Sequence, residues 1–130
     1  DTLTIIDDCY NANPSSVRAA LQSLSQTPGR RVCILGDMLE LGDETETLHA
    51  DMGRAAAEND VNVLIACGNL SHHTFAAAAA NGVQAHWFTD QDALCTALPQ
   101  LLKKGDTVLV KASHSCGFDR ITDFLTQLHL

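Results

Sequence analysis

One short segment near the amino terminus holds the densest set of side chains that could take part in chemistry. Residues 7–13 contain two aspartates, a tyrosine and two asparagines, directly after an apolar run at residues 3–6. In open α/β sheets, ligands bind at the carboxyl ends of the strands. Pro14 and Ser15 favour a helix start, whose free N–H groups attract an anion. The segment predicts a ligand-binding turn, although an Asx-rich turn with an ordinary N-cap uses the same residue types.

Two further polar turns each follow a strand-like run. The first spans residues 36–42 and carries Asp37, and the second spans residues 111–117 and begins at Lys111. If the strands are parallel, all three turns meet at one edge of the sheet. Lysine supplies a compact cation, and carboxylates hold ribose hydroxyls or ammonium groups. We therefore expect a phosphate-bearing or zwitterionic ligand there.

Each of these turns also has a plainer interpretation. Lys111 could be a solvated strand end, although a lysine after a buried strand is costly unless it is paired. Residues 113–115 could simply cap the last helix. Cys116 is expected to pack rather than to act as a nucleophile, because the sequence fixes no charged partner for it. His49 lies inside a helical pattern and is expected to be a surface or core residue rather than a catalyst.

Strand and helix patterns alternate along the whole chain. Strands are expected at residues 3–7, 31–35, 61–67, 85–88 and 107–111. Helices are expected at 16–26, from a capping box at 43–46 to 58, at 71–81, at 91–104 with a kink or break at Pro99, and after 117. This alternation predicts one α/β domain over residues 1–130, with a Rossmann-like, mostly parallel sheet covered by helices on both faces.

Composition narrows the possible partners. The 130-residue chain has a formal net charge of −8, which disfavours nucleic acid and anionic membranes. Its five cysteines form no CxxC motif and no zinc spacing, a pattern typical of a reduced, cytoplasmic protein. We expect a monomer with no signal peptide, no membrane insertion and no metal site.

Two common phosphate-binding motifs are absent. No GxGxxG motif follows the first expected strand, and no GxxxxGK[ST] motif occurs anywhere in the sequence. The chain therefore has a dinucleotide-type pattern without a glycine-rich phosphate loop, and it cannot hold a triphosphate in the usual way by itself.

Taken together, four segments resemble one known family. Residues 7–14 (DDCYNANP), residues 35–42 (LGDMLELG), His49 with Gly53, and residues 110–113 (VKAS) fall in order and at fitting distances. This set resembles the C-terminal domain of the Mur ligases, in particular the branch that uses D-alanyl-D-alanine, and the resemblance covers nearly the whole chain.

The resemblance implies an ATP-dependent amide ligase that adds D-alanyl-D-alanine to a UDP-N-acetylmuramoyl-tripeptide in peptidoglycan precursor synthesis. Such enzymes have three domains, of which this chain resembles the third, so the N-terminal and central ATPase domains would lie outside it. The implied cofactors are ATP and magnesium, with magnesium held mainly by the central domain. The implied small-molecule partners are ATP, the dipeptide and the UDP-sugar tripeptide.

The matching motifs also imply residue roles. Asp8 would hold the ATP ribose, and the nucleotide side would be lined by Tyr10, Asn11 and Asn13. The incoming dipeptide and the acyl phosphate would be faced by Asp37, Lys111, Ser113 and His114. No catalytic residue is expected on this chain. It departs from the family's usual lysine-glycine-serine-arginine run and later glutamate, since Ala112, His114 and Asp119 replace the glycine, the arginine and the glutamate.

Two other functions fit the sequence less well. A phosphoacceptor receiver domain fits the length, the acidic pair and the late lysine, but it needs an aspartate where the third strand ends in Ala66-Cys67-Gly68. A hydrolase built on residues 113–116 is disfavoured, because adjacent residues on one turn cannot form a nucleophile–base pair with a separate orienting group.

Overall fold

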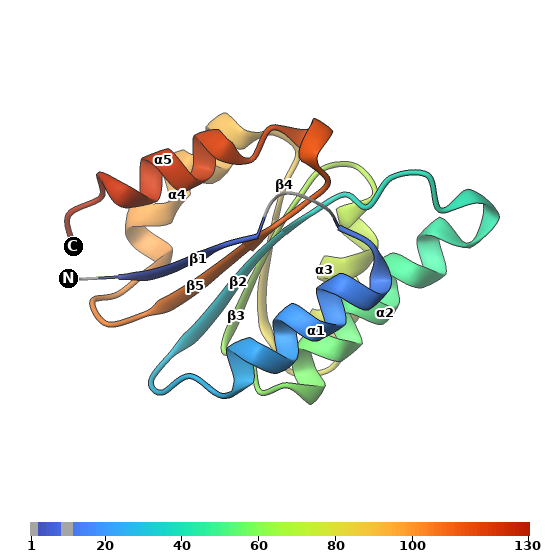
Figure 1. The fold of residues 1–130 in the computed structure, drawn as a ribbon, viewed down its shortest axis with the longest axis horizontal. Helices are drawn as coiled ribbons and strands as arrows, with labels where there is room; N and C mark the ends of the chain where they lie inside the picture. Colours follow the sequence, from blue (N-terminus) through green and yellow to red (C-terminus); the bar gives the residue numbers. More distant parts are fainter. Residues whose placement is uncertain (1–2, 9–11) are drawn as a thin grey trace.

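The computed structural model describes residues 3–8 and 12–130, and it confirms the expected α/β architecture. Five parallel strands form one sheet in the order β1-β5-β2-β3-β4 (Figure 1). The strands are β1 (Thr4–Asp7), β2 (Arg31–Gly36), β3 (Val63–Cys67), β4 (Gln84–Phe88) and β5 (Thr107–Lys111). The helices are α1 (Pro14–Ser25), α2 (Thr45–Glu58), α3 (Ser71–Ala80), α4 (Gln91–Leu101) and α5 (Asp119–Thr126), with short 3₁₀ turns η1 (Gly42–Glu44) and η2 (His114–Cys116).

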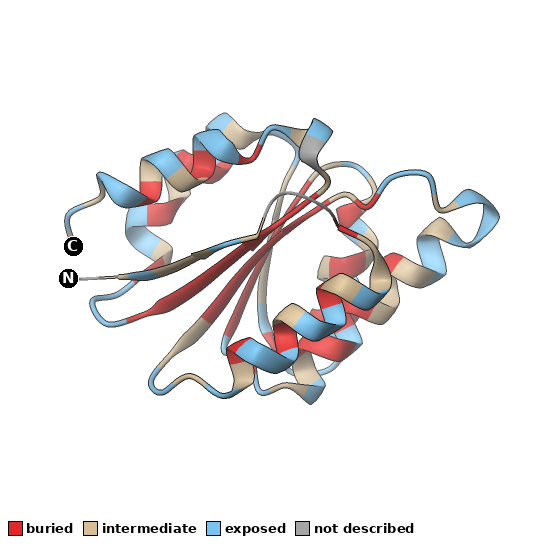
Figure 2. Ribbon diagram, in the orientation of Figure 1, coloured by how far each residue is buried: buried red, intermediate tan, exposed pale blue. Residues whose placement is uncertain are grey.

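Alternating side chains of the central strands build two separate cores. Val32 and Ile34 of β2 pack with α4 and α5, whereas Cys33 and Leu35 pack with α1 and α2 on the other face. Figure 1 shows the same division, with α4 and α5 on one side of the sheet and α1, α2 and α3 on the other. The central strands are consequently buried along most of their length (Figure 2). They carry continuous apolar runs because neither face meets water.

The strand order rules out the receiver interpretation. Receiver-type sheets have the order 2-1-3-4-5, with the first strand inside the sheet. Here β1 is an edge strand and pairs only with β5. The acidic segment that follows β1 therefore does not occupy the central position that a receiver domain requires.

Several element boundaries differ from the sequence-based expectation. The predicted capping box at residues 43–46 is wrong: Gly42–Glu44 forms a 3₁₀ turn, and α2 begins at Thr45 without a side-chain cap. Pro99 does not split α4, which continues to Leu101 and stops there. Proline removes one backbone N–H donor from a helix. Pro99 lies only two residues before the end of α4, so few helical hydrogen bonds follow it. In the described part of the chain, no helix is long and apolar enough to cross a membrane.

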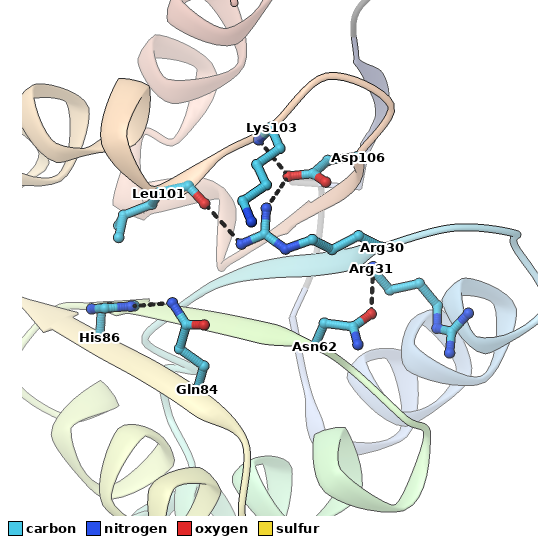
Figure 3. A network of polar contacts seen from close by, with 8 residues as sticks. All are labelled: Arg30, Arg31, Asn62, Gln84, His86, Leu101, Lys103 and Asp106. Carbon is cyan, nitrogen blue, oxygen red and sulfur yellow. Dashed lines mark hydrogen bonds and ion pairs between the residues drawn. The ribbon is translucent and has the colours of Figure 1, made fainter.

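A buried carboxylate ties together the amino ends of β2 and β5, opposite the candidate site. Asp106 is 1% exposed and accepts from Arg30 Nη1 at 2.9 Å and from the Lys103 N–H at 2.8 Å (Figure 3). Arg30 also donates to the Leu101 carbonyl at 3.0 Å, which joins the end of α4 to the same network. This network fixes where β5 enters the sheet.

We expect Asp106→Ala to lower the free energy of unfolding by roughly 2–4 kcal/mol, because it leaves a half-buried guanidinium and a backbone N–H without their acceptor. Urea unfolding followed by circular dichroism measures this. The matched control is Asp92→Asn, which breaks the exposed Asp92–Arg120 ion pair and should leave stability unchanged. Equal stability of the Asp106 variant and the parent chain would contradict the prediction.

Candidate functional site

The carboxyl ends of β1, β2 and β5 meet as predicted. Lys111 ends β5 level with Leu35 of β2, and Asp7 pairs with Val110 of β5. The helix after β2 covers one face of the sheet and the helix after β5 covers the other, so their connecting loops diverge. Such a divergence is a topological switch point, where α/β sheets form a ligand-binding crevice.

A buried lysine pairs with a solvent-facing aspartate in this crevice. The Lys111 side chain is 1% exposed, and its Nζ lies 2.9 Å from Asp8 Oδ2 and 3.3 Å from the Asp8 carbonyl oxygen. The Asp8 side chain is 46% exposed. Its backbone N–H donates to the Val110 carbonyl at 2.9 Å, which holds Asp8 beside β5. Lys111 is therefore not a solvated strand end, and the pair presents a fixed carboxylate to solvent beside an internal cation.

The loop at residues 37–41 is held by hydrogen bonds from two directions. The Met38 N–H donates to His49 Nε2 at 2.9 Å, and the Leu39 N–H donates to Ser113 Oγ at 3.3 Å. The Asp37 carbonyl accepts from the Ser113 N–H at 3.4 Å and from Cys116 Sγ at 3.6 Å. The turns after β2 and β5 therefore act as one unit, and both carry residues predicted for the dipeptide side.

Asp37 has both a structural and a potential binding role. Its Oδ1 accepts from the Ser71 N–H at 2.8 Å and from Ser71 Oγ at 2.6 Å, which anchors the start of α3. Gly68 has a φ of +121°, and a Cβ built there would lie 2.5 Å from Asp37 Oδ1. Glycine is therefore required at position 68 both for its backbone angle and for the close approach of the carboxylate.

A cleft opens beside Asp37, on the side of α4 and α5. It has a volume of about 470 Å³ and an acidic lining, with three carboxylates against one guanidinium. Asp90 Oδ1 caps α4 through the Ala93 N–H at 2.8 Å, and Asp92 pairs with Arg120. The lining residues are Asp37, Cys67, Gly68, Thr89, Asp90, Gln91, Asp92, Cys116, Gly117, Phe118 and Arg120.

The two thiols of this cleft are poor nucleophiles. Burial raises the pKa of Cys67 to about 11, with a further contribution from the charge of Asp37. Burial and the Asp37 carboxylate also raise the pKa of Cys116. Since the thiolate is the reactive form, both groups are largely unreactive near neutral pH. This agrees with the expectation that Cys116 packs, and neither of these two thiols is activated for a hydrolase.

Of the other predicted site residues, the structure describes Asn13 in full but not Tyr10, Asn11 or the side chain of His114. Asn13 is the N-cap of α1, and its Oδ1 accepts from the Ser16 N–H at 2.9 Å. Tyr10 and Asn11 lie outside the described residues, as does the side chain of His114. Among the described residues, no group of three or more histidine, cysteine, aspartate or glutamate side chains could hold a metal ion.

His49 is a core residue, one of the two places expected for it, but sequence reasoning missed its contact with the loop at residues 37–41 and missed the α4 side of the crevice. His49 follows Met38 by eleven residues and belongs to a different element, so neither helical nor strand periodicity could connect them. Gln91 donates to the Cys116 carbonyl at 2.8 Å across 25 residues, which is equally invisible to local pattern. Tertiary packing, not local sequence pattern, brings these partners together.

Comparisons with known proteins agree with this architecture. The relative from Escherichia coli, a UDP-N-acetylmuramoyl-tripeptide–D-alanyl-D-alanine ligase, is 39% identical over 95% of this chain and 27% of its own length. The enzyme of the same name from Mycobacterium leprae is 37% identical over 96% of this chain and 28% of its own length. The chain thus spans less than a third of the length of the curated relatives it matches.

Solved structures show the same relation. A MurF structure from Acinetobacter baumannii superimposes with a TM-score of 0.87 at 30% identity, over 97% of this chain and 29% of that one. MurF from Thermotoga maritima in complex with ADP has a TM-score of 0.78 at 22% identity, over 95% of this chain and 28% of its own, and shows the fold alone. Residues 1–114 match the family described as Mur ligase, glutamate ligase domain. On that match, which spans most of the chain, this protein belongs to the Mur ligase, glutamate ligase domain family.

Proposed function

We propose that this chain is the C-terminal domain of an ATP-dependent ligase that adds D-alanyl-D-alanine to a UDP-N-acetylmuramoyl-tripeptide in peptidoglycan precursor synthesis. The observation that carries the proposal is the coincidence of two findings. Relatives with this activity in their name match nearly the whole chain, and the chain's own motifs converge at the carboxyl edge of the sheet. ATP, the dipeptide and the UDP-sugar tripeptide are the proposed small-molecule partners, and the cytoplasm is the proposed location.

On the nucleotide side, Asp8 is the proposed contact to the ATP ribose. Its carboxylate is half exposed, and Lys111 fixes one of its oxygens at 2.9 Å. A carboxylate held in this way accepts ribose hydroxyls without having to be ordered first. Tyr10, Asn11 and Asn13 are proposed to line the same side, with the Asn13 oxygen already engaged in capping α1.

On the dipeptide side, Asp37, Lys111, Ser113 and His114 are the proposed contacts. Asp37 lines the acidic cleft, so a dipeptide that contacts it would enter this cleft or lie at its mouth. Carboxylates favour an ammonium end. Lys111 supplies the internal cation beside which the anionic acyl phosphate would be favoured. In this ligation the dipeptide nitrogen attacks the acyl phosphate carbon, an amide bond forms, and phosphate leaves.

Magnesium does not fit the described residues. The described carboxylates of the crevice lie beside different partners, Asp8 at Lys111, Asp37 at Ser71 and Asp90 at the start of α4. Among the described residues, no three histidine, cysteine, aspartate or glutamate side chains gather into a group that could hold a metal ion. Magnesium prefers an octahedral set of oxygen ligands supplied by one or two carboxylates together with phosphates and waters. We therefore propose that the central ATPase domain of the whole enzyme holds the ion.

The role of Asp8 can be tested in a full-length ligase that carries this chain. Asp8→Ala should raise the KM for ATP roughly ten- to a hundredfold, because a charge-assisted hydrogen bond contributes about 1.5–3 kcal/mol. Asp8→Asn separates binding from folding, since its amide oxygen still accepts from Lys111. The control is Asp7→Ala, which removes the adjacent exposed carboxylate. A rise in the KM for D-alanyl-D-alanine with an unchanged KM for ATP would refute the assignment.

The 130-residue chain by itself should fold but should neither hydrolyse ATP nor bind it tightly. With 130 residues and a hydrophobic core on each face of the sheet, the chain is within the size range of a domain that folds independently. Positioning and neutralisation of the β- and γ-phosphates supply most of phosphoryl-transfer catalysis, and the chain carries no phosphate loop for this. Titration calorimetry with ATP and magnesium measures the binding, and a phosphate-release assay measures turnover. Sub-micromolar binding, or release above the buffer control, would contradict the prediction.

A further inference from the structure

A fully buried histidine lies behind the loop at residues 37–41. His49 belongs to α2, is 0% exposed, and none of the proposed ATP or dipeptide contacts involves it. Burying an imidazole is costly unless both ring nitrogens are hydrogen-bonded. An apolar side chain could fill the same space without that cost. A polar ring at this position therefore calls for an explanation beyond packing.

The two ring nitrogens of His49 have different partners, and these partners fix one tautomer. Nδ1 lies 2.7 Å from the Thr45 carbonyl oxygen, which can only accept, so Nδ1 carries the proton. Nε2 lies 2.9 Å from the Met38 nitrogen, whose N–H can only donate, so Nε2 is the bare acceptor. Only the neutral Nδ1–H form satisfies both contacts. The ring thus links the first turn of α2 to the loop.

The helix that carries His49 packs closely against α3. Its carbonyl accepts from Thr74 Oγ1 of α3 at 2.9 Å, in the buried region where α2 and α3 pack. One turn along α2, Gly53 lies directly against the α3 backbone, with no room for a side chain. A ring whose helix is held by this packing can fix the backbone that the ring contacts.

The backbone that His49 holds is the one that carries Asp37. Met38 lies between Asp37, whose carboxylate anchors α3, and Leu39, whose N–H donates to Ser113 Oγ. Loss of the contact at Met38 would leave this buried N–H without an acceptor and free the middle of the loop. The Asp8 carboxylate, the proposed ribose contact, is held by Lys111 and by the Asp8 N–H bond to the Val110 carbonyl of β5, so the nucleotide side should be affected much less.

We propose that His49 is a positioning residue for the dipeptide side of the site. Through the Met38 N–H it holds the loop at residues 37–41 so that Asp37 faces the acidic cleft and the loop stays joined to Ser113. This inference rests on the proposed ligase function, and it assigns no chemical step to the imidazole itself.

Two substitutions separate the two contacts of the ring. The side-chain oxygen of His49→Gln reaches the place of Nε2 and can accept from Met38. The shorter His49→Asn keeps a donor in the place of Nδ1 for the Thr45 carbonyl but leaves Met38 without an acceptor. In a full-length ligase carrying this chain, we expect His49→Asn to raise the KM for D-alanyl-D-alanine about tenfold. The KM for ATP should stay within about twofold, and His49→Gln should restore most of the loss.

A second readout does not depend on ligase activity. In the chain itself, nitrogen NMR should report a neutral Nδ1–H imidazole for His49, and hydrogen exchange at the Met38 amide should speed up in His49→Asn but not in His49→Gln. Met52→Leu is the control for packing, because it changes a buried side chain of α2 in the core that also contains Met38 but removes neither hydrogen bond of the ring.

The outcomes separate this inference from the proposed function. An Nε2–H tautomer, or equal Met38 exchange in all variants, overturns the positioning role, as does an equal rise of both KM values in the Asn and Gln variants. If the unsubstituted ligase shows no activity that depends on D-alanyl-D-alanine, the proposed function itself is wrong and the positioning role falls with it. A dipeptide-specific KM effect rescued by glutamine, together with faster Met38 exchange in His49→Asn alone, supports the inference.

Discussion

Burial of the central strands on both faces is the constraint from which the site follows. Strands β2, β3 and β5 lie between two helical layers, so a polar side chain within them would be desolvated without a partner. Chemistry is therefore confined to the strand ends. In a parallel sheet, all the carboxyl ends lie at one edge, and every loop that follows a strand starts there. The crevice is a direct consequence of how the core is built.

Lys111 shows how a charge can be placed at the limit of this core. It is the last residue of β5 and lies on the face that Leu109 shares with α1 and α2. Two residues earlier in the strand, Leu109 is 1% exposed, so an ammonium there would be desolvated. At this position it reaches both the carboxylate and the carbonyl of Asp8, the residue directly after the edge strand. The pair thus depends on the strand order, since β1 must lie next to β5 for Asp8 to be present.

The predictable part of the structure is the part that local pattern encodes. Alternating apolar runs predicted the parallel sheet, and the polar residues after these runs predicted that Asp8, Asp37, Lys111 and Ser113 would meet. The start of α2 was mispredicted, because 43–46 carries the residue types of a capping box while the chain uses a 3₁₀ turn instead. Strand order was not predictable, and the partners that depend on it, such as Gln91 with the Cys116 carbonyl, were missed.

Several residues that look functional in the sequence also hold the fold together. Asn13 caps α1, Asp37 anchors α3, and Ser113 joins two loops through one hydroxyl. A residue that does both kinds of work gives ambiguous results when it is mutated, because loss of activity follows from either role. Pairs of substitutions that keep one hydrogen bond and remove another resolve this, since they change geometry while they leave burial nearly constant. His49 is well suited to such a pair because its two nitrogens contact two different elements, so the effect of the loop can be measured apart from the effect of the helix.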